Sequence, residues 1–402
     1  MQDPNRKKVG ATVGSIDMNP TVYIKQQLMK FIVSDTRRSI AHLLGRLRRR
    51  GNPIIHYFHQ VDDPFSHLAE QKLEQMRDRY AVDFICHNVS MPESIFQGDN
   101  SRFRDWALQD AKAIAPFYNT VLPTDFVDTE NLPDEETLVG NHLRKKLGHY
   151  LSGTFYYEGE WYWGIDRLFH LEHRLINSGL SRNQDSICVP RPEAESATGV
   201  AADNITLEYF PSLRSPYTAI SYDRTIDLVR RSGVTLRLRP VMPMMMRGIP
   251  APRAKQLYIL TDAKREADYY GIPFGNIVDP FGEPVKRAFA LFPYMQEIGR
   301  EIEYFSNYLK AAWAEGVDIT SNAGLRAVVT ASGGNWEEAK KRNDDWSSVL
   351  DNNVADMLEN GLWGVPSFRV SGIFKESFSC WGQDRLWRVE TEISRRANSH
   401  LT

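Results

Sequence analysis

The sequence predicts an α/β protein that consists of two similar domains, each a mixed β-sheet flanked by helices. Two observations lead to this prediction. A stretch of the first half recurs in the second half at a constant offset, and each copy starts with an apolar strand, a helix and a second strand. With 402 residues the chain is long enough for two or three domains of ordinary size.

The repeat is clearest at a turn that contains a proline. Residues 57–66 (YFHQVDDPFS) align without gaps with residues 209–218 (YFPSLRSPYT), so that Pro64 matches Pro216 at an offset of 152 (216 − 64). Residues 110–112 (DAK) recur at the same offset. This agreement over separate segments indicates a true internal repeat.

The two copies differ in the length of their middle part. Residues 163–168 (WGIDRL) match residues 381–386 (WGQDRL) at an offset of 218 (381 − 163), so the second copy has gained residues. Most of the gain lies in residues 291–353, which have helical periodicity, where the first copy has only the short segment 120–140. We therefore expect a full helical insertion in the second domain and a reduced one in the first.

Each copy is expected to begin with a βαβ unit, in which a helix of about 14 residues joins two strands. The second copy then continues, after the helical insertion, with an extended segment, a hairpin and a final amphipathic helix. The expected strands are 53–58 and 81–87 in the first copy and 205–210 and 234–239 in the second; the extended segment ends at 368–370 and the last helix covers 384–396.

These elements suggest four segments along the chain. Residues 1–20 form a polar N-terminal tail, and residues 21–176 form the first domain, including an N-terminal helical segment. Residues 177–203 are rich in Ser, Pro, Ala and Asn and are expected to be a linker. The second domain covers residues 204–402.

Composition excludes several classes of function. The net charge of −2, with 25% charged residues, gives no general attraction to nucleic acid or to an anionic membrane. We find no signal peptide and no apolar run of membrane-spanning length, and we expect a soluble, cytoplasmic protein. The three cysteines, Cys86, Cys188 and Cys380, contain no Cys-x-x-Cys pair, which excludes thiol–disulfide exchange by a local pair.

Five ordered motifs of the second copy resemble a known family. They are Ser215-Pro216-Tyr217 after the first strand, residues 238–241 (LRPV), the helical stretch 255–268, residues 364–368 (GVPSF) and residues 381–386 (WGQDRL). Together they resemble the DsbA-like group of thioredoxin folds, specifically 2-hydroxychromene-2-carboxylate isomerase and the kappa-class glutathione transferases. The resemblance implies two thioredoxin-like domains in tandem, of which the first is degenerate.

The resemblance also implies a catalytic role for Ser215. In this family a serine stands where disulfide oxidoreductases carry their nucleophilic cysteine, and the thiol comes from bound glutathione. A hydroxyl at a helix N-terminus can donate a hydrogen bond to a thiolate, and the helix dipole favours the anion. The alternative is that Ser215 followed by Pro216 only caps a helix.

Further residues are implied to bind glutathione. Tyr217 and Pro216 adjoin Ser215; Pro366 matches the family's cis-proline, and the backbone of Val365 before it would pair with the extended peptide. Asp384 would hold the ammonium group of the γ-glutamyl end. Gln383 replaces a serine that is common in the kappa enzymes. Pro366 could instead form an ordinary turn, and Asp384 could be a helix-start charge.

The first copy departs from the pattern at two of these positions. It has Asp63 where the second copy has Ser215, and Gly153 where the second has Pro366. A carboxylate would repel a thiolate. We therefore expect that the first copy does not bind glutathione productively and that it serves as an internal partner, as a second subunit does in dimeric relatives.

A cluster of methionines is a candidate substrate pocket. Met242, Met244 and Met245 follow the second strand of the second copy, and Tyr258 lies on the next helix. Soft, adaptable side chains of this kind suit an apolar pocket, although they also suit an ordinary core.

No metal site is expected. His170, Glu172 and His173 on the last helix of the first copy are interpreted as a solvated helix face. Motifs for nucleotide hydrolysis, α/β-hydrolases and zinc proteases are absent from the sequence.

The leading hypothesis is a glutathione-dependent isomerase or transferase that acts on an apolar or aromatic electrophile, with glutathione as cofactor. Two alternatives remain. One is a non-catalytic thioredoxin-like binding or interaction protein, which the degenerate first copy favours. The other is a DsbA-family oxidoreductase, by family label only, because no cysteine pair is present.

Overall fold

The computed structural model describes residues 18–49, 51–124, 134–182, 186–199, 202–342 and 344–399. The chain divides into two compact units. Unit 1 contains Met1–Ser34, Ala194–Ile249 and Ile259–Thr402, and unit 2 contains Asp35–Glu193 and Pro250–Tyr258. Most of the expected tail lies outside the described residues.

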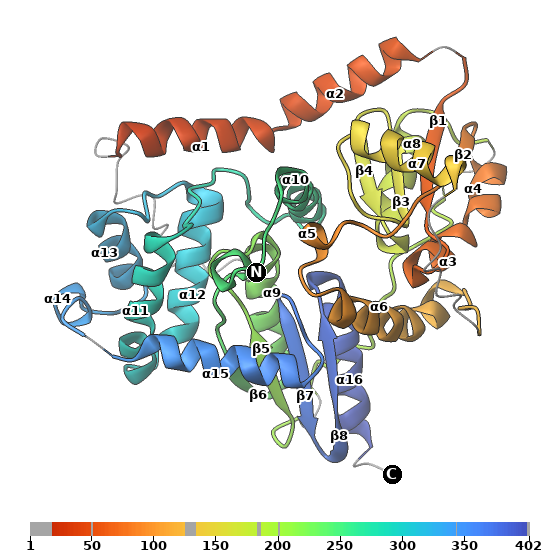
Figure 1. Cartoon of the computed structure of the whole chain (residues 1–402). Helices are drawn as coiled ribbons and strands as arrows, with labels where there is room; N and C mark the ends of the chain where they lie inside the picture. Colours follow the sequence, from red (N-terminus) through yellow and green to blue (C-terminus); the bar gives the residue numbers. More distant parts are fainter. Residues whose placement is uncertain are drawn as a thin grey trace. The chain divides into compact units, whose positions relative to one another are not determined.

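Unit 1 is built on a four-stranded sheet with the order β6-β5-β7-β8 (Figure 1). β5 pairs in parallel with β6 and antiparallel with β7, and β7 forms a hairpin with β8. The strands are β5 (Thr206–Phe210), β6 (Thr235–Leu238), β7 (Ser367–Gly372) and β8 (Phe374–Trp381).

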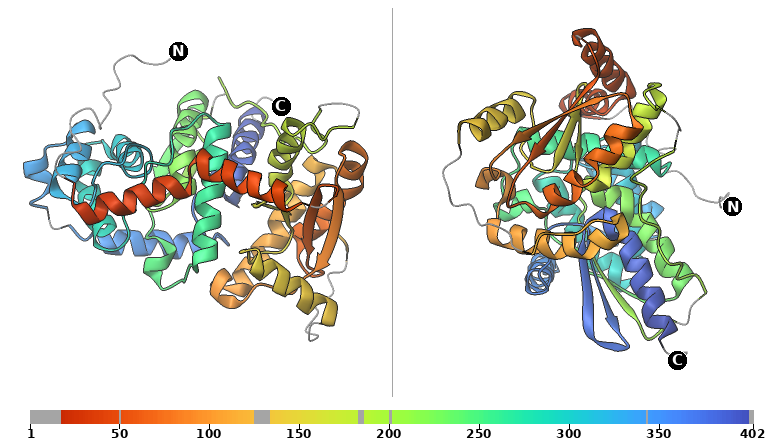
Figure 2. Two further views of the ribbon diagram at one scale, coloured as in Figure 1. Left: turned by 90° about the horizontal axis from the view of Figure 1, so that it is seen from above. Right: turned by 90° about the vertical axis from the view of Figure 1, so that its right-hand side faces the viewer.

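Helices cover this sheet and complete the core of unit 1. Two of them, α9 and α16, pack against each other, as the right-hand view of Figure 2 shows in green and blue. The helical elements are α1 (Pro20–Ile32), α9 (Pro216–Ser232), η5 (Met244–Arg247), α10 (Arg253–Tyr269), α11 (Glu283–Glu297), α12 (Glu301–Lys310), η6 (Ala311–Glu315), α13 (Asn322–Ala331), α14 (Trp336–Ala339), α15 (Trp346–Glu359), η7 (Gln383–Arg385) and α16 (Leu386–Asn398).

Unit 2 repeats the same sheet, with the order β2-β1-β3-β4. β1 again pairs in parallel with one neighbour and antiparallel with the other. Its elements are α2 (Asp35–Arg48), β1 (Ile54–His59), α3 (Pro64–Glu70), α4 (Leu73–Arg79), β2 (Asp83–Asn88), α5 (Ser94–Gln97), α6 (Asn100–Ile114), η3 (Ala115–Tyr118), α7 (Glu135–Lys146), β3 (Thr154–Tyr157), β4 (Glu160–Trp163), η4 (Ile165–Arg167) and α8 (Leu168–Asn177).

The equal strand orders confirm the predicted pair of related α/β domains. The helical insertion of the second copy contains α11 to α15, which lie between α10 and β7. The first copy has α7 in the corresponding interval. The helices of the insertion supply a large part of the unit 1 core, including Phe289, Phe305 and Trp313.

The unit boundaries differ from the expected ones at three places. α1 is counted with unit 1, where the buried Gln26 side chain donates hydrogen bonds to Asn276 Oδ1 and to the Gly316 carbonyl, both at 3.0 Å. The start of α10, up to Tyr258, is counted with unit 2. The expected linker, residues 177–203, is divided between the units after Glu193, and its first part is packed, because the Val189 N–H donates to Glu172 at 2.8 Å.

Within the described ranges, no helix combines the length and the apolar character that crossing a membrane requires. None of the three cysteines forms a disulfide, which agrees with the absence of a cysteine pair in the sequence.

Candidate active site

The turn between β5 and α9 places Ser215 at the N-terminus of a 17-residue helix. Ser215 has an extended backbone and is 7% exposed, and its Oγ accepts a hydrogen bond from the Thr218 N–H at 3.1 Å. Pro216 follows at the first helical position, where its fixed φ suits the helix and no N–H is needed. Because Oγ accepts from the backbone, its own proton is available to donate outward.

The segment that enters β7 lies beside the strand that leads to Ser215. Phe210, the last residue of β5, pairs with Ser367, the first residue of β7. The peptide bond between Val365 and Pro366, just before Ser367, is cis, as the resemblance implies. The Pro366 carbonyl accepts from the Gly382 N–H at 2.9 Å, which links this segment to the start of η7.

Gln383 of η7 forms hydrogen bonds that connect this element to α9 and α10. It is 2% exposed; its Nε2 donates to Glu266 of α10 at 2.8 Å and also contacts Asp384 Oδ1, and its Oε1 accepts from Arg224 of α9 at 3.3 Å. The structure thus brings Gln383 and Asp384 together with groups from α9 and α10.

Tyr217 also joins α9 to α10. Its hydroxyl donates to Asp262 Oδ2 at 2.8 Å, and its ring packs on a small apolar cluster that contains Ile220 and Ala263. Because the Tyr217 hydroxyl is engaged with Asp262, a contribution of Tyr217 to ligand binding would come from its ring or its backbone.

The methionines lie where the chain leaves β6. Met242 packs on the unit 1 core, while Met244 and Met245 are in η5 and partly buried. Met245 Sδ is 3.2 Å from Nη1 of Arg214, the residue before Ser215. Arg214 is itself held by Asp279, with Nε to Oδ1 at 2.7 Å. Sequence analysis missed Arg214, although its position next to Ser215 was a signal.

Tyr258 is placed elsewhere. It is counted with unit 2, where its hydroxyl accepts from the Trp163 N–H at 3.1 Å and its ring contacts His149 edge to face at 4.7 Å. We therefore leave Tyr258 out of the site that Ser215 defines.

Asp63 of unit 2 occupies the position that corresponds to Ser215. Its carboxylate accepts from the N–H groups of Phe65 (3.3 Å) and Ser66 (3.0 Å), from the Ser66 hydroxyl (2.6 Å) and from the Ser152 hydroxyl (3.0 Å). Burial raises the pKa of Asp63, and these hydrogen bonds oppose the rise. The carboxylate thereby ties the start of α3 to the segment that enters β3.

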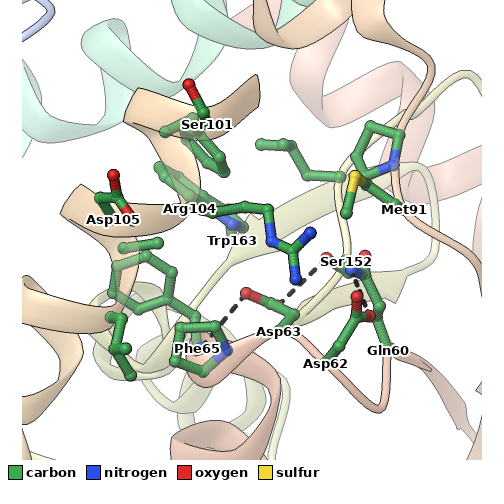
Figure 3. Close-up of a pocket in the computed structure, with 16 residues that line it drawn as sticks. Gln60, Asp62, Asp63, Phe65, Met91, Ser101, Arg104, Asp105, Ser152 and Trp163 are labelled. Carbon is green, nitrogen blue, oxygen red and sulfur yellow. Dashed lines mark hydrogen bonds between the residues drawn. The ribbon is translucent and has the colours of Figure 1, made fainter. Parts of the chain in front are cut away.

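A cavity of about 350 Å³ opens above this turn in unit 2 (Figure 3). Sequence analysis gave no sign of it. Its polar lining includes Gln60, Asp62, Asp63, Arg104, Asp105 and Ser152, and its apolar lining includes Phe65, Met91, Phe103, Leu151 and Trp163. Gln60 is 5% exposed, and within the described part of the chain its Oε1 meets no hydrogen-bond donor.

The helix-face interpretation of α8 is wrong for one residue. Glu172 is fully buried and accepts from the Tyr80 hydroxyl (2.6 Å) and from the Cys188 N–H (2.7 Å). It anchors the segment after unit 2's last helix, whereas His173 on the same helix is exposed.

The sheet order, the serine-capped helix and the cis-proline before β7 define a thioredoxin-like α/β domain. Residues 206–394 match the family model of the DSBA-like thioredoxin domain. The second half of the chain therefore carries a DsbA-like thioredoxin domain.

Known proteins similar to this chain cover about half of it. 2-Hydroxychromene-2-carboxylate isomerase of Pseudomonas putida is 24% identical over 212 residues, in a match that covers 49% of this chain and 98% of the relative. A solved structure of 2-hydroxychromene-2-carboxylate isomerase is 22% identical, covers 49% of this chain and 99% of its own, and has a TM-score of 0.41. The cytosolic disulfide reductase DsbM from Pseudomonas aeruginosa with GSH is 14% identical over 49% of this chain and 97% of its own, with a TM-score of 0.36.

Proposed function

We propose that unit 1 is a glutathione-dependent isomerase or transferase of the 2-hydroxychromene-2-carboxylate isomerase type. The observation that carries the proposal is Ser215, a buried hydroxyl at the N-terminus of a long helix in a DsbA-like domain without a cysteine pair. The similarity to a curated isomerase supports the same reaction class. An oxidoreductase of this fold would need a thiol pair that the chain lacks.

Glutathione fits the arrangement at the α9 N-terminus. When bound, it would supply a thiolate that adds reversibly to an electrophilic carbon of the substrate. Ser215 accepts from the Thr218 N–H and keeps its own O–H proton to donate to sulfur. The positive end of the α9 dipole favours the anion in the same place.

The rest of the tripeptide has candidate partners in unit 1. The backbone of Val365, before the cis-proline, is suited to pair with an extended peptide in the manner of an added strand. Gln383 and Asp384 offer an amide and a carboxylate to the γ-glutamyl end, with Pro216 and Tyr217 contributing from the start of α9. Binding there would require the Gln383–Asp384 contact to rearrange.

The substrate is proposed to be an apolar or aromatic electrophile. Met242, Met244 and Met245 supply flexible, polarizable side chains near Arg214 and the Ser215 turn. Arg214, held by Asp279, could orient an anionic group of the substrate at the edge of this apolar wall.

Calorimetric titration of glutathione into the full chain tests the proposal. Wild type is expected to bind, and Ser215→Ala is expected to lose affinity and to fail to lower the thiol pKa, which thiolate absorbance reports. Asp63→Asn in unit 2 is the matched control and should bind like wild type. Absence of glutathione binding to wild type would rule out the proposal, and equal binding by Ser215→Ala would remove Ser215 from it.

A second candidate function is ligand binding by unit 2, and the cavity at Asp63 favours it. The unpaired Gln60 Oε1 and the carboxylates of Asp62 and Asp105 provide acceptors, while Phe65 and Trp163 provide aromatic walls. This combination suits an amine with an aromatic body. Phenethylamine should therefore bind more tightly than phenethyl alcohol, and Gln60→Ala should weaken binding; equal affinities for the two probes would contradict the idea.

We further propose that the first copy acts as an internal partner for unit 1, in place of a second subunit. A monomeric mass of the full chain by light scattering is expected. A stable dimer would argue against this role.

A further inference from the structure

Three potential metal ligands gather at the start of unit 2. His59, His67 and Glu70 each offer one ligand atom, and these atoms all lie within 4.8 Å of one another. None of the three belongs to the proposed glutathione site, and sequence analysis, which expected no metal, did not single them out.

The local fold explains why the three residues meet. His59 is the last residue of β1, and the turn that follows leads directly into α3. His67 and Glu70 are three residues apart on α3, so they share one face of the helix. The rings of His59 and His67 are in edge-to-face contact, with centroids 5.2 Å apart.

The separation of His59 and Glu70 fits an ion pair and also fits two ligands of one metal ion. His59 Nδ1 and Glu70 Oε2 are 3.8 Å apart, beyond the range of a hydrogen bond. Two ligands bound tetrahedrally to zinc at about 2.1 Å lie roughly 3.4 Å from each other. A small side-chain adjustment would therefore bring both atoms to bonding distance of one ion.

A backbone carbonyl orients the imidazole ring of His67. His67 Nε2 donates to the Val61 carbonyl at 2.6 Å, which places the proton on Nε2 and the lone pair on Nδ1. Such a supporting hydrogen bond from the second ring nitrogen is typical of metal-binding histidines. The Tyr57 hydroxyl donates to the Ser66 carbonyl at 2.6 Å and lies 3.3 Å from His59 Nδ1, so an ion bound at Nδ1 would replace the contact between this hydroxyl and the ring.

The site is open to solvent on one side. The side chain of His59 is 10% exposed and that of Glu70 is 50% exposed. An ion held by the three residues would keep a coordination position for water, as zinc does when two histidines and a glutamate bind it.

The second copy lacks all three ligands. At the offset of 152, the corresponding residues are Pro211, Ala219 and Tyr222. Of the two copies, only the one with Asp63 in place of the serine carries the cluster.

We propose that His59, His67 and Glu70 form a binding site for a divalent zinc ion in unit 2. The site has two nitrogen ligands and one carboxylate, a set that suits zinc better than magnesium or calcium. The proposal stands independently of the glutathione site in unit 1.

Calorimetric titration of zinc chloride into the full, tag-free and chelator-treated chain tests it. We expect one ion per chain, and a bound cobalt ion should show the visible absorption of tetrahedral coordination. His67→Ala and Glu70→Gln change side chains that are not fully buried, and each should weaken zinc binding at least about tenfold, since even supporting residues contribute that much.

The double variant His170→Ala/His173→Ala is the matched control, because it removes two histidines of unit 2 that lie outside the cluster. It should bind zinc like wild type, and circular dichroism should show all variants folded. The proposal is overturned if wild type binds no zinc, or if His67→Ala and Glu70→Gln bind it as tightly as the control.

Discussion

At the turn after the first strand, Ser215 of unit 1 accepts a hydrogen bond from the backbone of its helix, whereas Asp63 of unit 2 accepts four. A hydroxyl that caps a helix still has a proton to donate. A carboxylate has only acceptors, and those of Asp63 are used inside the unit. The same position in the same fold can therefore serve an external anion in one copy and internal structure in the other.

The backbone segment that faces this turn also differs between the two copies. Gly153 has a φ of +60°, which proline cannot adopt, and a Cβ at this position would lie 3.2 Å from Asp63 Oδ2. Its carbonyl nevertheless accepts from Gly164 N–H, as the Pro366 carbonyl accepts from Gly382. The two segments are equivalent in the sheet but not interchangeable.

Removal of the two caps should have unequal effects on stability. Asp63→Ala leaves the buried N–H and hydroxyl groups of Ser66 and the Ser152 hydroxyl without this acceptor. We expect the free energy of unfolding to fall by about 3 kcal/mol. Ser215→Ala removes one cap hydrogen bond and should cost about 1 kcal/mol. Urea denaturation of both variants measures the difference; equal losses would show that the additional hydrogen bonds of Asp63 contribute nothing.

Ser215→Asp separates capping from thiolate binding. Aspartate caps a helix as well as serine does, so the stability of unit 1 should change little. A carboxylate beside the sulfur should weaken the binding of the glutathione thiolate by about a hundredfold, or about 2.7 kcal/mol. Calorimetry of glutathione binding, with urea denaturation of the same sample, would contradict the proposed role if affinity were retained.

The stability of the two units should respond differently to pH. Because burial raises the pKa of Asp63 above its ordinary value of 3.8, the folded state holds this proton more tightly than the unfolded state. Its contribution is therefore most favourable below pH 3.8 and decreases as pH rises through the folded pKa, by at most about 1.4 kcal/mol per pH unit.

Ser215 does not titrate and gives unit 1 no such dependence. Asp63→Asn should remove the decrease from unit 2, which denaturation at several pH values would show. An unchanged pH profile in this variant would assign the effect to another group.

The sequence was sufficient for the features that depend on local pattern. The repeated strand-turn-helix segment predicted both sheets, and the Ser215-Pro216 pair predicted a helix start. Features that depend on distant packing were missed: the burial of Glu172 requires Tyr80 and Cys188, which its own helix pattern does not reveal. The contacts of Tyr258 with Trp163 and His149 were missed for the same reason, since the periodicity of α10 gives its apolar face but not the partner of that face.

An effect as small as that of Ser215→Ala is expected at the link between the turn and the β3 segment. Ser152→Ala removes one of the four hydrogen bonds to Asp63 and leaves the other three in place, so we expect a loss of about 1 kcal/mol. If this bond also holds the segment that enters β3 against the start of α3, the variant should show faster amide hydrogen exchange around Gly153 than wild type. Val365→Ala, the equivalent change before Pro366 in unit 1, removes no side-chain hydrogen bond and serves as the control. Equal exchange in wild type and Ser152→Ala would mean that the Ser152 bond does not hold this segment, and that Asp63 acts only as the cap of α3.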